Sequence, residues 1–307
     1  MFTKIKVVGL GGSGNNALSR MKKCNIKGVE LIAINTDAQD LTKTRADFKI
    51  RIGKKATQGL GSGMDPEVGR KSALENKEEI RKALEGAEMV FLTCGLGGGT
   101  GTGSIPVVAE IAKEMGILTL AIVTTPFSFE GQVRKKLAEN GARRLKERVD
   151  TLITISNDKL LSTLDPKTPL MNAFWACDDV LRQAVQGISD LVSLPGIINV
   201  DFADVKAIMA NAGSAIFGVG RAQGEGRGQR AALSAINSPL LDLSVKGAKG
   251  VLFNVSGGKD ISLAEIDEVA KIITQEMNQE AKVIFGAVQD DKLKAGELKV
   301  TVIATGF

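Results

Sequence analysis

The 307-residue sequence contains no histidine and no tyrosine, and only one tryptophan and three cysteines. Without histidine, the commonest general base and the Ser-His and Cys-His nucleophile pairs are excluded. Cys24, Cys94 and Cys177 are far apart and form no CxxC pair, so a zinc site is not expected and we predict reduced packing residues. Any chemistry must therefore depend on carboxylates, amides, backbone groups and a metal ion.

Long apolar runs are also missing, because no stretch approaches the ~18 residues of a membrane span. The N-terminal segment MFTKIKVVGL leads into a predicted strand and lacks a signal-peptide pattern, so we expect a cytoplasmic protein without membrane insertion. The net charge of +5 is partly concentrated in residues 134–148. With few aromatic side chains to stack on bases, this run indicates a solvated helix face rather than nucleic-acid binding, and an acidic partner is the alternative.

The first half of the sequence alternates short β-branched runs with helical stretches, which predicts a doubly wound, mostly parallel, Rossmann-like α/β domain. A long central helix and a smaller α/β domain follow, and the predicted boundaries are 1–168, 169–195 and 196–307. The predicted strands are 4–10, 29–36, 48–52, 88–94, 117–124, 151–156, 215–222, 250–257, 282–289 and 299–307. A helix of about 20 residues is predicted from Asp65-Pro66. The long helix is predicted to run from Pro169 to Leu194, where Pro195-Gly196 stops it. Further helices are predicted to begin near Thr102, Glu130 and Asp201 and to span 228–237 and 263–277.

Two glycine-rich loops, GLGGSG (9–14) and GLGGGTGTG (95–103), follow the first and fourth predicted strands. In the strand order 3-2-1-4-5-6 these strands are neighbours at the switch point, so the loops are predicted to face each other across one crevice. The first loop, with Asp37 ending the second strand, also fits a dinucleotide fingerprint, and a tight turn without ligand is a further alternative. Two converging loops favour a chain of several phosphates, held by backbone N–H groups, helix N-termini and Mg²⁺.

The loop GLGGGTGTGS resembles the signature loop of the tubulin and FtsZ superfamily. The segments GLGSGMDPEVGR, TTPFSFEG, SNDKLL, VLRQAVQGISDL, NVDFADVKAIM and SPLLDLSVKGAKGVLFNVSGG resemble the FtsZ family in order and spacing, over essentially all 307 residues. The resemblance implies a GTPase that binds GTP and GDP with Mg²⁺ and polymerises head to tail into filaments of the cytokinetic ring, in the cytoplasm at the division site. It also implies division and membrane-tethering partners that bind through a C-terminal tail absent from this sequence.

The resemblance further implies a set of GTP-binding residues from both loops and the segments around them. They comprise Gly11, Gly12, Ser13, Gly14, Asn15, Asn16, Gly61, Ser62, Gly63, Gly97, Gly98, Gly99, Thr100, Gly101, Thr124, Pro126, Glu130, Arg134, Asn157, Phe174 and Asp178. Gly61–Gly63 would lie near the γ-phosphate, Glu130 and Arg134 along the ribose and phosphates, and Asn157 at the base. Asn199, Asp201 and Asp204 would be catalytic, and the metal ligands remain unassigned.

Base recognition is expected at the start of the long helix, where Phe174 and Asp178 are four residues apart and share a face. This spacing offers an aromatic platform beside a carboxylate that can accept both donors of the guanine edge, although core packing is the alternative for Phe174. Two sequence positions next to this site, Ser156 and Trp175, depart from the family pattern, as does Asp65 beside the predicted γ-phosphate loop.

Asp201 and Asp204 have the spacing of a capping box, which requires no ligand. The helix between Asp178 and Ser193 rises ~1.5 Å per residue, which places the Asp201 loop roughly 20 Å from its own nucleotide. A head-to-tail neighbour would bring the loop to a γ-phosphate, and such a heterologous contact generates a filament. A nicotinamide oxidoreductase and a non-hydrolysing structural relative that binds GTP remain the alternative functions.

Overall fold

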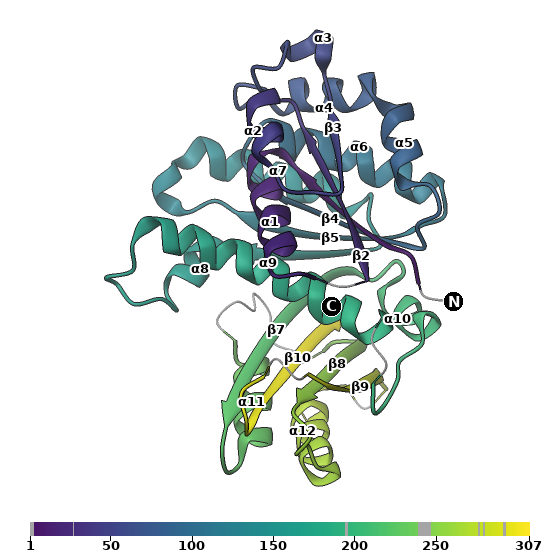
Figure 1. The fold of residues 1–307 in the computed structure, drawn as a ribbon, viewed down its shortest axis with the longest axis vertical. Coiled ribbons are helices and arrows are strands. Elements are labelled where there is room, and N and C mark those ends of the chain that lie inside the picture. The colour runs from purple at the N-terminus through teal and green to yellow at the C-terminus, as the bar shows by residue number, and fades with distance from the viewer. Residues whose placement is uncertain are drawn as a thin grey trace. The chain divides into compact units, whose positions relative to one another are not determined.

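The computed structural model describes residues 3–26, 28–193, 196–238, 247–275, 277–278, 280–290 and 293–307 (Figure 1). The chain divides into two compact units, residues 1–186 and 187–307. The predicted stop of the long helix at Leu194 and Pro195 lies outside the described residues, as does most of the segment SPLLDLSVKG. No described helix combines the length and the apolar character needed to cross a membrane.

The first unit is built on a parallel sheet whose strand order agrees with the sequence prediction. Its strands are β1 (Ile5–Leu10), β2 (Val29–Asn35), β3 (Phe48–Arg51), β4 (Met89–Gly95), β5 (Leu118–Thr125) and β6 (Thr151–Ser156). They lie in the order β3-β2-β1-β4-β5-β6, and each neighbouring pair is parallel. Because β1 pairs directly with β4, the two glycine-rich loops leave the same edge of the sheet side by side.

Helices connect these strands and contribute to the core of the first unit. They are α1 (Gly11–Lys23), α2 (Ala38–Lys43), α3 (Lys54–Thr57), α4 (Pro66–Glu75), α5 (Lys77–Leu84), α6 (Thr100–Glu114), the 3₁₀ turn η1 (Ser128–Glu130), α7 (Gln132–Lys146) and α8 (Asn157–Leu161). The long helix α9 (Leu170–Ser193) follows and continues into the second unit. Strand residues such as Val8, Ile32 and Leu92 pack with Val108 of α6 in one buried cluster.

The single helix of about 20 residues predicted after Asp65 is wrong, because the structure has two helices there. Asp65 caps α4 by accepting a hydrogen bond from the Glu67 N–H at 2.8 Å, as predicted. Asn76 then leaves the helical conformation, with φ −114° and ψ 25°. Its Oδ1 atom accepts from the Gly53 N–H at 3.0 Å. This tertiary hydrogen bond holds the Asn76 side chain, and α5 restarts at the following residue.

Among the described residues of the second unit, four strands pair in a mixed arrangement. Its elements after α9 are α10 (Phe202–Met209), β7 (Gly213–Gln223), α11 (Arg227–Ile236), β8 (Gly250–Gly257), α12 (Leu263–Gln275), β9 (Lys282–Gln289) and β10 (Glu297–Thr305). Within this unit the order is β7-β10-β8-β9, with β10 antiparallel to β7 and β8, and β8 parallel to β9. Phe253, Val269 and Val300 belong to its buried core, so the predicted smaller α/β domain is present.

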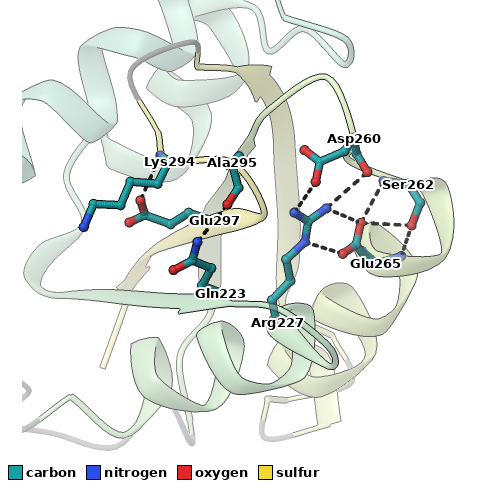
Figure 2. Close-up of polar contacts among 8 residues, drawn as sticks. All are labelled: Gln223, Arg227, Asp260, Ser262, Glu265, Lys294, Ala295 and Glu297. Atoms are coloured by element: carbon teal, nitrogen blue, oxygen red, sulfur yellow. Dashed lines mark hydrogen bonds and ion pairs between the residues drawn. The ribbon is translucent and has the colours of Figure 1, made fainter.

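A buried arginine joins two helix starts in the second unit (Figure 2). Arg227, at the first position of α11, is 6% exposed and donates from Nε to Glu265 Oε1 at 2.6 Å and from Nη1 to Asp260 Oδ2 at 2.6 Å. Glu265 also accepts from the N–H of Ser262 at 2.9 Å, at the start of α12. The hydrogen bonds from Arg227 are the main cause that lowers the pKa of Glu265 to about 2. These contacts tie the start of α11 to the start of α12.

Candidate nucleotide-binding site

The two glycine-rich loops meet at the carboxyl ends of β1 and β4. Gly11 has a φ of +69°, and a Cβ atom there would lie 3.0 Å from the backbone nitrogen of Gly101. An alanine would therefore be strained by its backbone conformation and would crowd the facing loop. The loops border a cleft of about 930 Å³, whose lining also includes Gly95 at the end of β4 and Thr124 near the end of β5. This volume is in the range of small-molecule sites.

Most of the predicted GTP-binding residues line this cleft. They are Gly11, Gly12, Ser13, Asn16, Ser62, Gly98, Gly99, Thr100, Gly101, Thr124, Pro126, Glu130, Arg134, Asn157, Phe174 and Asp178. The other predicted positions, Gly14, Asn15, Gly61, Gly63 and Gly97, are not in its lining. Gly14 packs against the strands, since a Cβ there would lie 2.5 Å from the Thr93 carbonyl oxygen. The catalytic candidates Asn199, Asp201 and Asp204 belong to the second unit.

Hydroxyl groups connect the second loop to its surroundings. Thr100 Oγ1 lies 2.6 Å from Thr36 Oγ1 and 2.9 Å from Ser62 Oγ. Thr102 Oγ1 accepts a hydrogen bond from the Gly97 N–H at 2.9 Å. These bonds hold the loop with little freedom, so its backbone groups keep their directions at the cleft.

Two helix N-termini border the cleft, since α1 begins at Gly11 and α6 begins at Thr100. The first N–H groups of a helix lack intrahelical partners and carry a partial positive charge, which favours an anion. Asp37, the acid that a dinucleotide enzyme would use on a ribose, caps α2 by accepting from the N–H groups of Gln39 and Asp40. It is not in the cleft lining, so the dinucleotide alternative loses its ribose ligand.

The opposite end of the cleft is formed by α8 and α9. Phe174 is 38% exposed and contacts the Phe127 ring edge to face, with centroids 5.4 Å apart, so it is not a closed core residue. Asn157 is buried, and its Oδ1 atom has no hydrogen-bond partner in the part of the chain described. Ser156, where the family pattern has a proline, caps α8 by accepting from the Lys159 N–H at 3.4 Å. An orphaned acceptor in the same cleft as the Asp178 carboxylate suits a ligand with several donors.

Asp178 has an unusual electrostatic environment in this part of the cleft. Burial raises the pKa of its carboxyl group to about 6, while the positive charge of Arg20 lowers it and the negative charge of Asp179 raises it. Glu130 and Arg134 form an ion pair with each other, and Glu130 Oε1 also accepts from the Phe127 N–H at 3.0 Å. One N–H donor of Arg134 is therefore already bonded to Glu130, and a sugar or phosphate ligand would bind the remaining donors of Arg134.

Sequence reasoning missed Arg20 and did not place Cys24 in the cleft, and it noted Trp175 beside the predicted base site without giving it a role. Asn16, Arg20 and Cys24 are spaced four residues apart on α1, so helix periodicity from the predicted contact Asn16 could have identified them. Cys24 is exposed, which contradicts its predicted packing role. The other two cysteines are buried as predicted, and burial raises the pKa of the Cys177 thiol to about 12.

The described residues contain no group of three or more Asp, Glu, Cys or His side chains placed to hold a metal ion. The carboxylates in the cleft lining are those of Glu130 and Asp178. Glu130 forms an ion pair with Arg134, and Asp178 lies within ion-pair distance of Arg20. A divalent cation in this cleft would thus have to take most of its oxygen ligands from bound phosphates and waters, a mode that Mg²⁺ uses commonly.

A parallel sheet with a cleft at the carboxyl ends of two neighbouring central strands is the architecture of nucleotide-binding α/β proteins. Residues 4–165 match the GTPase domain of the Tubulin/FtsZ family, and residues 213–307 match the C-terminal domain of the FtsZ family. The chain belongs to the tubulin/FtsZ family, whose members share this GTPase fold and bind GTP or GDP. The predicted family and fold class are thereby confirmed.

Solved structures agree with this assignment. The chain is similar to an empty FtsZ dimer from M. jannaschii, with 49% sequence identity and a TM-score of 0.95, covering 100% of this chain and 89% of that chain. It is also similar in fold to the GTPγS-bound protofilament of CetZ2 and the GDP-bound monomer of CetZ1, both from Haloferax volcanii. The CetZ2 match has 21% identity and a TM-score of 0.82, and it covers 98% of this chain and 92% of that chain. The CetZ1 match has 20% identity and a TM-score of 0.84, and it covers 99% of this chain and 94% of that chain.

Proposed function

We propose that this chain binds GTP in the cleft, hydrolyses it to GDP and phosphate, and polymerises head to tail into filaments of the cytokinetic ring. The family assignment supports GTPase activity in general terms. The observation that carries the finer proposal is the approach of Gly11 to Gly101, which brings two glycine-rich backbones and two helix N-termini to one cleft. A triphosphate, which presents negative charge over its whole length, suits this double cradle.

The phosphates would be held by backbone N–H groups of residues 11–13 and 98–101, because neither loop contains lysine or arginine. Mg²⁺, bound through phosphates and waters, would supply the positive charge that the loops lack. Segment 61–65 would reach the γ-phosphate, since a Cβ at Gly99 would lie 2.7 Å from the Asp65 nitrogen. Arg134 would add a cation along the phosphates or ribose.

The guanine base would lie against Phe174, with Asp178 accepting hydrogen bonds from its N1–H and N2–H groups. The orphaned Oδ1 of Asn157 would accept a further donor, or its amide would turn to donate. Adenine has an acceptor at N1 and would leave the ionised carboxylate poorly matched. This part of the cleft therefore favours GTP over ATP.

Catalysis would require Asn199, Asp201 and Asp204 of the next subunit, which would orient and polarise the water that attacks the γ-phosphorus. In the structure, Asp204 Oδ2 accepts from the Asp201 N–H at 3.3 Å, and Asn199 Oδ1 accepts from the Gly196 N–H at 2.7 Å. Both aspartates are exposed. Their local bonds keep the loop ordered and leave carboxylate lone pairs for a water molecule, so the capping role and the catalytic role are compatible.

Self-association is supported by two similar structures, an FtsZ dimer and a CetZ2 protofilament. We extend head-to-tail assembly to this chain, with residues 1–168 as GTP-binding domain, 169–195 as connecting helix and 196–307 as activation domain. A cytoplasmic location at the division site, and tethering partners that bind a tail, belong to the same proposal.

The variant Asp204→Ala tests the catalytic part of this proposal. GTP binding should stay unchanged, while the rate of phosphate release at assembling concentrations should fall by about 100-fold, the scale of one lost acid or base group. Asp267→Ala is the matched control, because Asp267 is an exposed aspartate on α12 of the same unit, paired with Lys271. Full turnover in Asp204→Ala would exclude the loop from the mechanism, and weak GTP binding by the unmodified chain would exclude the function itself.

A further inference from the structure

Two cleft residues outside the proposed GTP contacts lie beside Asp178. Arg20 comes from α1, and Trp175 comes from α9 three residues before Asp178, so Trp175 and Asp178 share one side of that helix. Trp175 is the only tryptophan of the chain and is 50% exposed. Because half of this indole side chain is exposed at the wall of the cleft, core packing alone does not explain it.

Arg20 contacts both of these side chains. Its Cζ atom lies 5.4 Å from the centroid of the Trp175 ring, within the range of a cation–π interaction. Its Nε atom lies 3.9 Å from Asp178 Oδ2, too far for a hydrogen bond but close enough for a strong charge interaction. That Nε atom is buried and has no hydrogen-bond partner within the described residues. The indole of Trp175 thus holds the guanidinium group near the Asp178 carboxylate, and the Nε atom of Arg20 forms no hydrogen bond with that carboxylate.

The charged groups around Asp178 act in opposite directions. Burial disfavours the carboxylate, and Asp179 of the same helix adds to this effect. Asp179 itself is held by hydrogen bonds from Arg182 and Gln183 at 2.7 Å each. From α1, Arg20 is the cation that opposes both effects. Because arginine stays protonated at all accessible pH values, this support is constant.

We propose that Arg20 is a positioning residue which, held by the indole of Trp175, favours the ionised form of Asp178 and thereby maintains the preference for guanine over adenine at mildly acidic pH. Guanine presents two donors that an ionised carboxylate accepts together. Adenine presents an acceptor at N1, which a protonated carboxyl group would match instead. The inference rests on the proposed function, since it assumes a guanine nucleotide in this cleft.

The test measures the dissociation constants of GDP and ADP for the full chain at pH 6 and pH 8 by titration calorimetry. Loss of a neighbouring cation raises a carboxyl pKa by about one unit. For Arg20→Gln, ionised Asp178 becomes scarcer at pH 6, and GDP affinity should fall by about fivefold there and by less than about twofold at pH 8. ADP affinity should hold or rise at pH 6, so the GDP-to-ADP preference falls only at the lower pH.

Three further variants separate this role from simple damage to the site. Arg20→Lys keeps a cation on the same helix and should restore most of the guanine preference at pH 6. Trp175→Leu removes the surface that holds the guanidinium group and should change the pH dependence in the same direction as Arg20→Gln, but less. Lys22→Gln removes one charge from an exposed lysine of α1 that pairs with Asp47, and should behave as the unmodified chain.

The melting temperature and far-UV circular dichroism would show whether Arg20→Gln is folded, because neither depends on the contact between Arg20 and Trp175. The inference is overturned if folded Arg20→Gln keeps the unmodified GDP-to-ADP preference at both pH values, or if its preference falls equally at both. If Arg20→Gln does not fold, Trp175→Leu decides the question by the same pH comparison. An unmodified chain that binds ADP as tightly as GDP would overturn the proposed function itself, which is a distinguishable result.

Discussion

Gly11 and Gly101 approach so closely that a Cβ atom at Gly11 would lie 3.0 Å from the Gly101 nitrogen. The variant Gly11→Ala should therefore lose GTP binding, because the φ of +69° costs an alanine about 1 kcal/mol or more and the methyl group pushes the facing loop away. Nucleotide affinity by calorimetry, with thermal unfolding in parallel, measures both effects.

Gly116→Ala is the matched control for this change. Gly116 has a similar φ of +75°, but nothing lies within 4 Å of a Cβ at that position. It should show comparable backbone strain with unchanged GTP affinity. Equal loss of affinity in both variants would mean that crowding between the two loops does not matter for the site.

Asp178→Asn should stabilise the nucleotide-free chain while weakening guanine binding. The carboxyl pKa is raised from 3.8 to about 6 in the folded state, so the protonated form is favoured by folding and the charged form destabilises the protein above pH 6. Asparagine avoids that charge, and the free energy of unfolding at pH 7 should rise by about 1–3 kcal/mol. Arg20 keeps 26% of its side chain exposed and its contact with the Trp175 ring, so loss of the carboxylate does not leave its charge fully buried.

The pH dependence of this stability difference provides the check. The advantage of Asp178→Asn should fade as pH falls below the unfolded-state pKa of 3.8, where the wild-type carboxyl becomes protonated in both states, and should grow as pH rises to 6. Denaturant unfolding without nucleotide at pH 4, 5, 6 and 7 measures it. A difference that does not vary across this range would contradict the raised pKa of Asp178.

Asp65→Asn should change phosphate preference without changing the helix cap. Asparagine caps helices as well as aspartate does, so the N-terminus of α4 and the stability should be preserved. The backbone of Asp65 lies beside Gly99 in the second loop, so the carboxylate of this residue adds negative charge in the neighbourhood of the proposed γ-phosphate position. Removing that charge should raise the affinity for GTP relative to GDP by about two- to tenfold at low salt. An unchanged GTP-to-GDP ratio would place the γ-phosphate away from this loop.

Arg227→Ala should destabilise the second unit by about 3 kcal/mol at pH 7, since it leaves Glu265 and Asp260 without their buried partner. The pKa of Glu265 is lowered from 4.5 to about 2, so its stabilising contribution is present above pH 4.5 and is lost as pH falls through 2. The difference from wild type should therefore narrow between pH 5 and pH 3 in thermal unfolding. Arg230→Ala, an exposed arginine on the same helix, is the control, and a pH-independent difference would contradict the account.

Sequence patterns were sufficient for the order of the six parallel strands, because each strand is a β-branched run followed by a helix. They were also sufficient for the meeting of residues 9–14 with 95–103, since adjacent parallel strands end at the same edge. They could not show that Asn76 divides one predicted helix, because this depends on its hydrogen bond to Gly53, 23 residues earlier.

The base end of the cleft shows the same limit. Phe174 and Asp178 were predicted from their spacing on one helix, whereas Arg20 enters from α1 and has no sequence relation to Trp175. Contacts between distant elements, and the burial that raises the pKa of Asp178, arise only when the helices pack. Trp175 was evident as a departure from the family pattern, but its partner was not.

Hydrolysis is proposed to require a neighbouring subunit. The most direct test is the rate of phosphate release per subunit as a function of protein concentration, with light scattering recorded in the same samples. The account predicts that the rate per subunit is low at dilute concentration and rises at the concentration where GTP-dependent scattering begins. A rate per subunit that is constant at all concentrations, including those below the onset of scattering, would contradict it.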